Sequence, residues 1–335
     1  MWETVISSIW DCVNLPRTIA TGEDIHIGFF DSVYRPPENA AITLGHTESV
    51  IESDSTETNI HGANVTTLAL AFASEATYSF YQVVNESGRF GISEFAEGIA
   101  RAIQHDLDLI NISAGAHMKG CQGYCAFCSA VSRCLQAGIG VVAAAGNEFP
   151  DEQTEQVNCP ANREGVIAVG GMITECHCIE NNPDADIDDP PPGAFYPSPV
   201  TDESADVIHE HPICGQAGCT TEFTCIGNQR DRPWVGNPTP TRGKPDVLAP
   251  CYTVYTTDDG TELFTFGSSF AAPVVTGTLG AILSEEAAET GKTVPAEQLR
   301  SLVRDSAAMM DQGELKTLDG TRLLNDCLAA VSSDD

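Results

Sequence analysis

Ser269 lies in the stretch Phe266-Gly267-Ser268-Ser269-Phe270-Ala271-Ala272-Pro273, directly before residues 273–287, which have the periodicity of a helix. Proline is favoured at the first position of a helix, so we predict that this helix begins at Pro273. Its backbone N–H groups and the positive end of its dipole would then favour a negative charge that develops beside the serine. A serine in this place is also a common helix cap, so the stretch alone leaves both interpretations open.

Asp31 and His61 occupy comparable positions earlier in the chain. Asp31 ends the apolar run Ile27-Gly28-Phe29-Phe30, and His61 begins a stretch of small residues that can form a helix packed closely on a sheet. Each residue alone has an ordinary explanation, since an aspartate after a strand usually forms a turn and a histidine at a helix start is usually solvated. Aspartate, histidine and serine in this chain order are, however, one known arrangement of a catalytic triad.

Six segments in the same order resemble the subtilisin-like serine peptidases, the subtilases. Residues 267–273 are similar to the family's Gly-Thr-Ser-X-Ala-Ala-Pro motif, with Ser268 in place of the threonine. His61-Gly62-Ala63-Asn64-Val65 is similar to the His-Gly-Thr-His-Val motif, with Asn64 in place of the second histidine. The strand that ends at Asp31 is a third match. The remaining matches are residues 110–115, 141–148 and 244–250.

The resemblance implies a three-layer α/β fold, with a mainly parallel central sheet and helices on both faces. The sequence favours the same class, because short β-branched runs alternate with helical patterns. The expected strands are residues 25–30, 79–84, 107–113, 140–145, 165–169 and 246–249, and the expected helices include 92–105, 126–137, 273–287 and 295–308. We expect residues 1–335 to form one catalytic domain, with its core at about 20–330 and an irregular insertion rich in Cys, Pro and Asp at about 175–242.

The resemblance also implies a serine endopeptidase whose triad is Asp31, His61 and Ser269. The amide of Asn147 and the backbone N–H of Ser269 would hold the oxyanion of the reaction. A protein or peptide substrate would bind as an extended strand, and no cofactor would be required for the chemistry. The expected substrate-binding residues are Ser113, Ala114, Gly115, Ala145, Gly146 and, at the rim of the pocket, Glu148.

Other functions use the same residues. A peptide ligase or macrocyclase would let an amine resolve the acyl-enzyme, and the insertion could then be a cap that excludes water. A dedicated maturation protease would cleave one precursor. An inactive scaffold that only binds peptides is the third alternative, but such a protein has no use for an intact triad together with Asn147.

The thirteen cysteines are an odd number, so at least one thiol is unpaired within the chain. Cys134 and Cys327 lie in apolar helical patterns and are expected in the core, whereas Cys159 could belong to the core or to a cluster. The candidate cluster residues can bind zinc, form disulfides or remain free, and the sequence leaves these alternatives open. Calcium is frequent in the family, but no ligand pattern here is specific for it. The candidate metal ligands are Cys121, Cys125, Cys128, Cys176 and Cys178.

The charge balance excludes a nucleic-acid partner. The chain has 16 Lys+Arg against 48 Asp+Glu, and its net charge of −32 opposes binding to phosphates. A chain that is this acidic and contains so few lysines indicates a halophilic organism as its source, because concentrated salt screens the repulsion between acidic side chains. No apolar run reaches the ~20 residues that cross a membrane. No signal peptide is evident, so we expect a cytoplasmic protein, or an extracellular one if the chain is a processed mature form.

Overall fold

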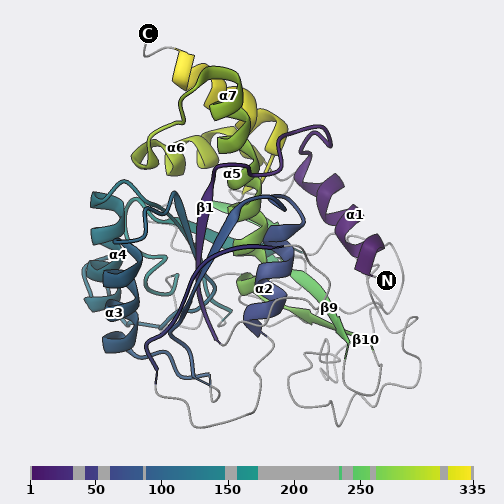
Figure 1. Ribbon diagram of the computed structural model, residues 1–335. Coiled ribbons are helices and arrows are strands. Elements are labelled where there is room, and N and C mark those ends of the chain that lie inside the picture. The colour runs from purple at the N-terminus through teal and green to yellow at the C-terminus, as the bar shows by residue number, and fades with distance from the viewer. Residues whose placement is uncertain are drawn as a thin grey trace.

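The chain was analysed as a computed structural model, drawn in Figure 1. Apart from Trp234–Val235, the expected insertion at 175–242 lies outside the residues that the structure describes. Among the described residues, no helix is both long and apolar enough to cross a membrane. The structure describes residues 2–32, 42–51, 61–85, 88–147, 157–172, 234–235, 244–256, 262–309 and 316–332.

A mainly parallel sheet forms the middle layer of the fold. Each of the six expected strands is present, with ends that differ from the expectation by at most three residues. Neighbouring strands along the main path of the sheet are parallel except for β11 (Ala308–Met309) and β12 (Lys316–Thr317). Beside this path, β7 (Trp234–Val235) pairs antiparallel with β6 (Ile167–Met172). The order along the path is β11 (Ala308–Met309), β12 (Lys316–Thr317), β8 (Val247–Pro250), β6 (Ile167–Met172), β5 (Gly140–Ala144), β4 (Leu109–Ile112), β1 (His26–Asp31), β3 (Thr77–Gln82) and β2 (Thr43–Ser49).

Helices cover both faces of this sheet, as Figure 1 shows. Side chains alternate between the faces along each strand, so Phe29 and Val142 belong to one buried cluster while Phe30 and Val141 belong to another. The second cluster is covered by α3 (Ile92–Ala102) and α4 (Ala126–Gln136). This arrangement confirms the three-layer α/β fold. The first cluster is covered by α1 (Trp2–Val13), α2 (His61–Leu70), α5 (Ser268–Thr290), α6 (Ala296–Ser306) and α7 (Gly320–Ser332).

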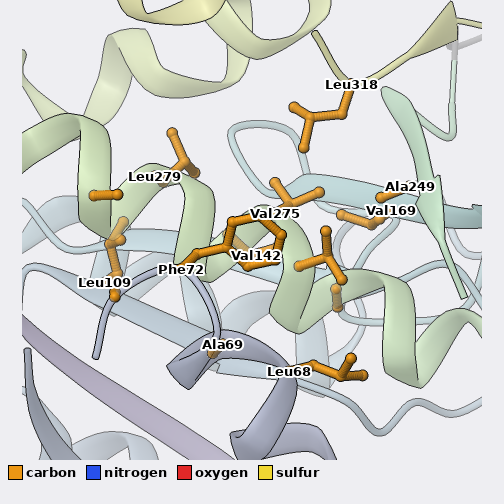
Figure 2. Packing of buried hydrophobic residues seen from close by; sticks show 14 of the residues in the cluster. Leu68, Ala69, Phe72, Leu109, Val142, Val169, Ala249, Val275, Leu279 and Leu318 are labelled. Atoms are coloured by element: carbon orange, nitrogen blue, oxygen red, sulfur yellow. The ribbon is translucent and has the colours of Figure 1, made fainter. Parts of the chain in front are cut away.

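Helix α5 runs through the interior of the first cluster. Figure 2 shows Val275 and Leu279 of this helix gathered with Phe72 and with Val142 of the sheet. A Cβ at Gly277 would lie 2.6 Å from the carbonyl oxygen of Ala69, so glycine permits the close approach of α5 to α2. The buried position of α5 fixes its first residues, which carry the candidate nucleophile, against the sheet.

The start of α5 differs from the expectation. The helix begins at Ser268, five residues before Pro273, so the prediction of a start at Pro273 was wrong. An antiparallel hairpin of β9 (Tyr252–Thr256) and β10 (Glu262–Phe266) leads into the helix. Gly267 makes the turn between them with a φ of 156° and a ψ of 158°, a conformation that is essentially confined to glycine.

Candidate active site

Asp31 and His61 meet at the carboxyl end of β1. The Nδ1 atom of His61 lies 2.8 Å from Oδ1 of Asp31, and the same oxygen accepts a 2.6 Å hydrogen bond from the backbone N–H of Ser32. The Ser32 hydroxyl in turn accepts a 3.1 Å hydrogen bond from the N–H of Gly62, so the first turn of α2 is attached to the end of β1. The Asp31 side chain is only 5% exposed, whereas that of His61 is 33% exposed. A buried carboxylate therefore orients a histidine that remains open to a ligand.

Opposing effects act on the pKa of His61. Burial disfavours the imidazolium and lowers the pKa, but the charge of Asp31 and the hydrogen bond to it raise the pKa, and together they prevail. The pKa of His61 therefore lies above its ordinary value. Any reaction that needs neutral His61 as a base is expected to slow as the pH falls through this raised pKa.

The start of α5, which carries Ser269, lies next to His61. The His61 ring is 5.3 Å from the ring of Phe270, the residue that follows Ser269. The Ser269 carbonyl accepts a 2.7 Å hydrogen bond from the Ser113 hydroxyl. In a regular helix this carbonyl would accept from the N–H four residues later, but residue 273 is proline and has no N–H. Because Pro273 cannot donate to it, the Ser269 carbonyl accepts from Ser113 instead. This hydrogen bond connects Ser269 to the end of β4.

A buried polar chain continues from Ser113 into the interior. Asn111 Nδ2 donates to the Ser113 hydroxyl at 2.9 Å, and Asn111 Oδ1 accepts from the hydroxyl of Thr276 on α5 at 3.0 Å. Asn111 and Thr276 position the site although the sequence motifs do not predict this role. A fully buried asparagine inside the apolar strand β4 was the available signal, because buried amides need hydrogen-bond partners.

Asn147 is held by the residue before Ser269. Its Oδ1 accepts hydrogen bonds from the backbone N–H of Ser268 at 2.8 Å and from the Ser268 hydroxyl at 2.9 Å. With Oδ1 engaged in this way, the Nδ2 amide is the end of the side chain that can donate to an oxyanion. The Ser268 hydroxyl also contacts the backbone of Gly146 at 3.1 Å. Ser268, which differs from the expected motif, thus keeps a hydroxyl that fixes Asn147.

The same edge of the sheet carries the expected substrate-binding segments. Ser113 is buried, Ala114 is half-buried and Gly115 is exposed directly after β4, whereas Ala145 and Gly146 are buried after β5. These residues thus lie at the carboxyl ends of neighbouring parallel strands, where open α/β sheets bind ligands. Glu148, expected at the rim of the pocket, lies outside the described residues.

Comparison with known proteins identifies the family of this chain. The model of the subtilase family, Peptidase_S8, matches residues 25–325. The chain belongs to the subtilase family. Subtilisin DY from Bacillus licheniformis is 32% identical to this subtilase over 161 residues, which are 45% of the chain and 57% of Subtilisin DY. Subtilisin E from Bacillus subtilis (strain 168) is 35% identical over 103 residues, which are 31% of the chain and 26% of Subtilisin E. The matched regions thus span less than two thirds of either relative.

Solved structures resemble the subtilase over nearly its whole length. A variant of the protease domain of PatA matches with a TM-score of 0.63 and 18% identity, and the match covers 96% of this chain and 99% of that one. The nisin leader peptidase NisP from Lactococcus lactis matches with a TM-score of 0.57 and 17% identity, over 95% and 94% of the two chains. At this identity the likeness establishes the fold.

The structure brings four cysteines of the subtilase together and places others in the core. Cys121, Cys125 and Cys128 lie together as expected, and Cys159 joins them. Cys176 and Cys178 lie outside the described residues. Cys134 and Cys327 are fully buried in the two hydrophobic clusters, which confirms them as core residues. The described residues do not test calcium binding, for which the sequence offers no specific ligand pattern.

Proposed function

We propose that this subtilase is a serine endopeptidase that cleaves protein or peptide substrates through an acyl-enzyme. The observation that carries the proposal is the 2.8 Å contact between His61 Nδ1 and Asp31 Oδ1, formed beside the start of α5. A scaffold that only bound peptides would gain nothing from a buried carboxylate directed at a half-exposed histidine. Asp31, His61 and Ser269 are therefore assigned to the triad.

The proton transfers follow from the tautomer of His61. Because Nδ1–H donates to Asp31, Nε2 carries the lone pair and is the base. Nε2 takes the proton of the Ser269 hydroxyl while Oγ bonds to the substrate carbonyl carbon. His61 then returns this proton to the leaving amine as the peptide bond breaks, and water repeats the sequence on the resulting ester. The Asp31 carboxylate stabilises the imidazolium between these steps.

Asn147 and the N–H of Ser269 are assigned to the oxyanion of the tetrahedral intermediate. The contacts of Asn147 Oδ1 with Ser268 support this assignment, because they fix the amide before the charge develops. An extended substrate would pair with residues 113–115 by strand addition. Its side chain would enter a pocket beside Ala145 and Gly146, with Glu148 at the rim.

A second candidate is a maturation protease dedicated to one precursor peptide. Maturation proteases occur among the solved structures of similar fold, including the Patellamide maturation protease PatA and the Prenylagaramide maturation protease PagA. This candidate uses the same triad and differs only in the range of substrates. A broad panel of peptides would therefore be cleaved by a general endopeptidase and almost entirely spared by a dedicated one.

Product analysis tests the proposed reaction. A peptide substrate is incubated with the protein in the presence and absence of a free amine nucleophile, and the products are identified by mass spectrometry. We expect fragments that carry a new carboxylate in both samples, because water resolves the acyl-enzyme. Products joined to the amine in place of water would instead assign a ligase, and the absence of any cleavage by folded protein would contradict both enzymes. The Ser269→Ala variant provides the blank.

We also propose that the protein requires concentrated salt. The net charge of −32 and the presence of only four lysines support this, and one of the four, Lys244, is buried against Asp246. Screening lengths fall from ~10 Å at about 0.1 M salt to ~3 Å at about 1 M, so repulsion between surface carboxylates weakens strongly. We expect the thermal unfolding midpoint and the activity to rise together between these conditions. Equal stability and full activity at both concentrations would contradict the salt requirement and leave the peptidase assignment intact.

A further inference from the structure

Four thiols lie close together near residues 113–115, the segment expected to pair with an extended substrate. The sulfur atoms of Cys121, Cys125, Cys128 and Cys159 all lie within 4.8 Å of one another. Cys121 comes from the loop before α4, Cys125 and Cys128 from the start of α4, and Cys159 from the segment between β5 and β6. Among the described residues the remaining cysteines lie outside this group, at Cys12, Cys134, Cys251 and Cys327.

The spacing of the sulfur atoms suits a single metal ion. Four thiolates at the Zn–S distance of about 2.3 Å occupy tetrahedral corners that are ~3.8 Å apart, within the limit seen here. A disulfide requires two sulfur atoms at about 2.05 Å, and all four cysteines are free in this structure. Soft thiolate ligands in a tetrahedral set select zinc over calcium or magnesium, which prefer oxygen.

Hydrogen bonds and a positive charge next to the cluster favour thiolates over neutral thiols. The backbone N–H of Gly123 donates to the Cys121 sulfur at 3.3 Å, which stabilises negative charge on it. The side chain of Asn162 donates to the Cys121 carbonyl at 2.7 Å, so the loop is held to the segment that carries Cys159. The Arg163 guanidinium contacts the Gly123 carbonyl at 3.4 Å and lies over the Tyr124 ring, bringing a positive charge to the loop.

We propose that Cys121, Cys125, Cys128 and Cys159 bind one structural zinc ion. Binding transfers the four thiol protons to solvent and leaves a centre of charge −2, which the nearby guanidinium of Arg163 partly offsets. Four protein ligands fill the tetrahedral shell, so the ion has no open position for water or substrate and takes no part in peptide cleavage. Its role is to join three segments of the chain.

These segments form the wall of the expected substrate-binding region. Cys159 and Ala116 exchange two backbone hydrogen bonds of 2.9 Å, and the N–H of Asn158 donates to the Ala145 carbonyl at 2.8 Å. A Cβ at Gly115 would lie 3.1 Å from the Asn158 side chain, so these residues are in close contact. The ion therefore fixes a bridge between the segment after β4 and the segment after β5, on either side of the proposed pocket.

Metal content measured on matched variants tests the site. We expect about one zinc per chain in the purified full-length protein, as the four-ligand site holds a single ion. Zinc is expected to be lost in Cys128→Ser, Cys159→Ser and the half-buried Cys121→Ser, and kept in Cys134→Ala, which removes a buried thiol of the same helix outside the cluster. Replacement of the wild-type metal by Co²⁺ should give the visible absorption of a tetrahedral thiolate complex, a readout that does not depend on how the variants fold.

Several results would overturn the proposal. Disulfides among these four cysteines in the intact mass, four free thiols in protein without metal, iron in place of zinc, or zinc retained in all three cluster variants would each do so. Loss of zinc from Cys134→Ala as well would show that the metal is not specific to the cluster.

A kinetic consequence rests on the proposed peptidase function. Because the ion supports the pocket and not the triad, its removal should raise KM severalfold more than it lowers kcat. A protein that binds zinc without cleaving peptides would refute the peptidase and keep the metal site. Protein that cleaves peptides and contains no zinc as purified would refute the metal site and keep the peptidase.

Discussion

Replacing Ser269 by alanine is expected to lower kcat for peptide cleavage by on the order of 10⁶-fold, the loss that removal of the nucleophile causes in subtilisin. Without the Ser269 hydroxyl no acyl-enzyme can form, so water must attack the peptide carbonyl directly. Peptide binding should survive, since the contacts expected along residues 113–115 do not involve the Ser269 hydroxyl. The measurement is kcat with a fluorogenic peptide, together with the Kd of the uncleaved peptide for the variant.

The neighbouring serine provides a matched control. Ser268→Thr keeps a hydroxyl beside Asn147 Oδ1, and threonine is the residue of the resembled motif, so this variant should remain active. Thermal unfolding of both variants should remain close to that of the unaltered protein, because each change removes or adds only small groups. Retention of substantial activity in Ser269→Ala would show that another residue is the nucleophile.

Replacing Asp31 by asparagine is expected to lower kcat by about 10⁴-fold, because an amide that donates to Nδ1 holds the wrong histidine tautomer. The substitution keeps the shape of the side chain and removes its charge, so the 2.8 Å contact with His61 can persist while its chemistry changes. A control is Asp305→Asn, which removes a carboxylate from the exposed pair with Arg304. Activity within tenfold of the unaltered enzyme in Asp31→Asn would contradict the assigned triad.

The pH dependence of the same variant gives a second readout. In the unaltered protein Asp31 holds the pKa of His61 above its ordinary value, so activity is lost as the pH falls through that raised pKa. Without the Asp31 charge, burial alone acts on His61 and lowers its pKa. The acidic limb of kcat/KM should therefore move to lower pH in Asp31→Asn. An acidic limb that does not move would show that a group other than His61 titrates there.

The central strands could be predicted because their buried sequences are continuous apolar runs. β1, β4 and β5 are covered on both faces, and such strands are recognisable without any partner. The edge strand β2 has no such run, because it is largely exposed and carries polar residues such as His46 and Glu48. Its pairing with β3 decides its conformation, and a single sequence does not contain that information.

The preference of proline for the first position of a helix predicts a start at Pro273, whereas α5 begins at Ser268. Pro273 lies within the first turns, where the carbonyl that it leaves unpaired belongs to Ser269 and is taken by Ser113. This partner is 156 residues away in the chain, so helix rules alone could not place it. The positions of Asp31, His61 and Ser269, the proposed triad, could be predicted, because each lies at a strand end or near a helix start with a recognisable motif.

The cysteine cluster shows the same limit. Cys125 and Cys128 share a turn of α4, and their proximity follows from helix spacing. Cys159 is held near them by an isolated antiparallel bridge between Ala116 and Cys159, a contact that helix spacing does not predict. Cys176 and Cys178, the other candidate ligands, lie outside the described residues.

Covalent labelling of Ser269 is the most direct measurement of the proposed activity. A fluorophosphonate probe reacts with a serine only when a base and an oxyanion site activate it, and peptide mapping identifies the labelled residue. At several molar salt we predict one modified serine, Ser269, in the unaltered protein, and no modification in His61→Ala. Folded protein that stays unlabelled, or a label on a serine other than Ser269, would contradict the assignment of this subtilase as a serine endopeptidase with Ser269 as its nucleophile.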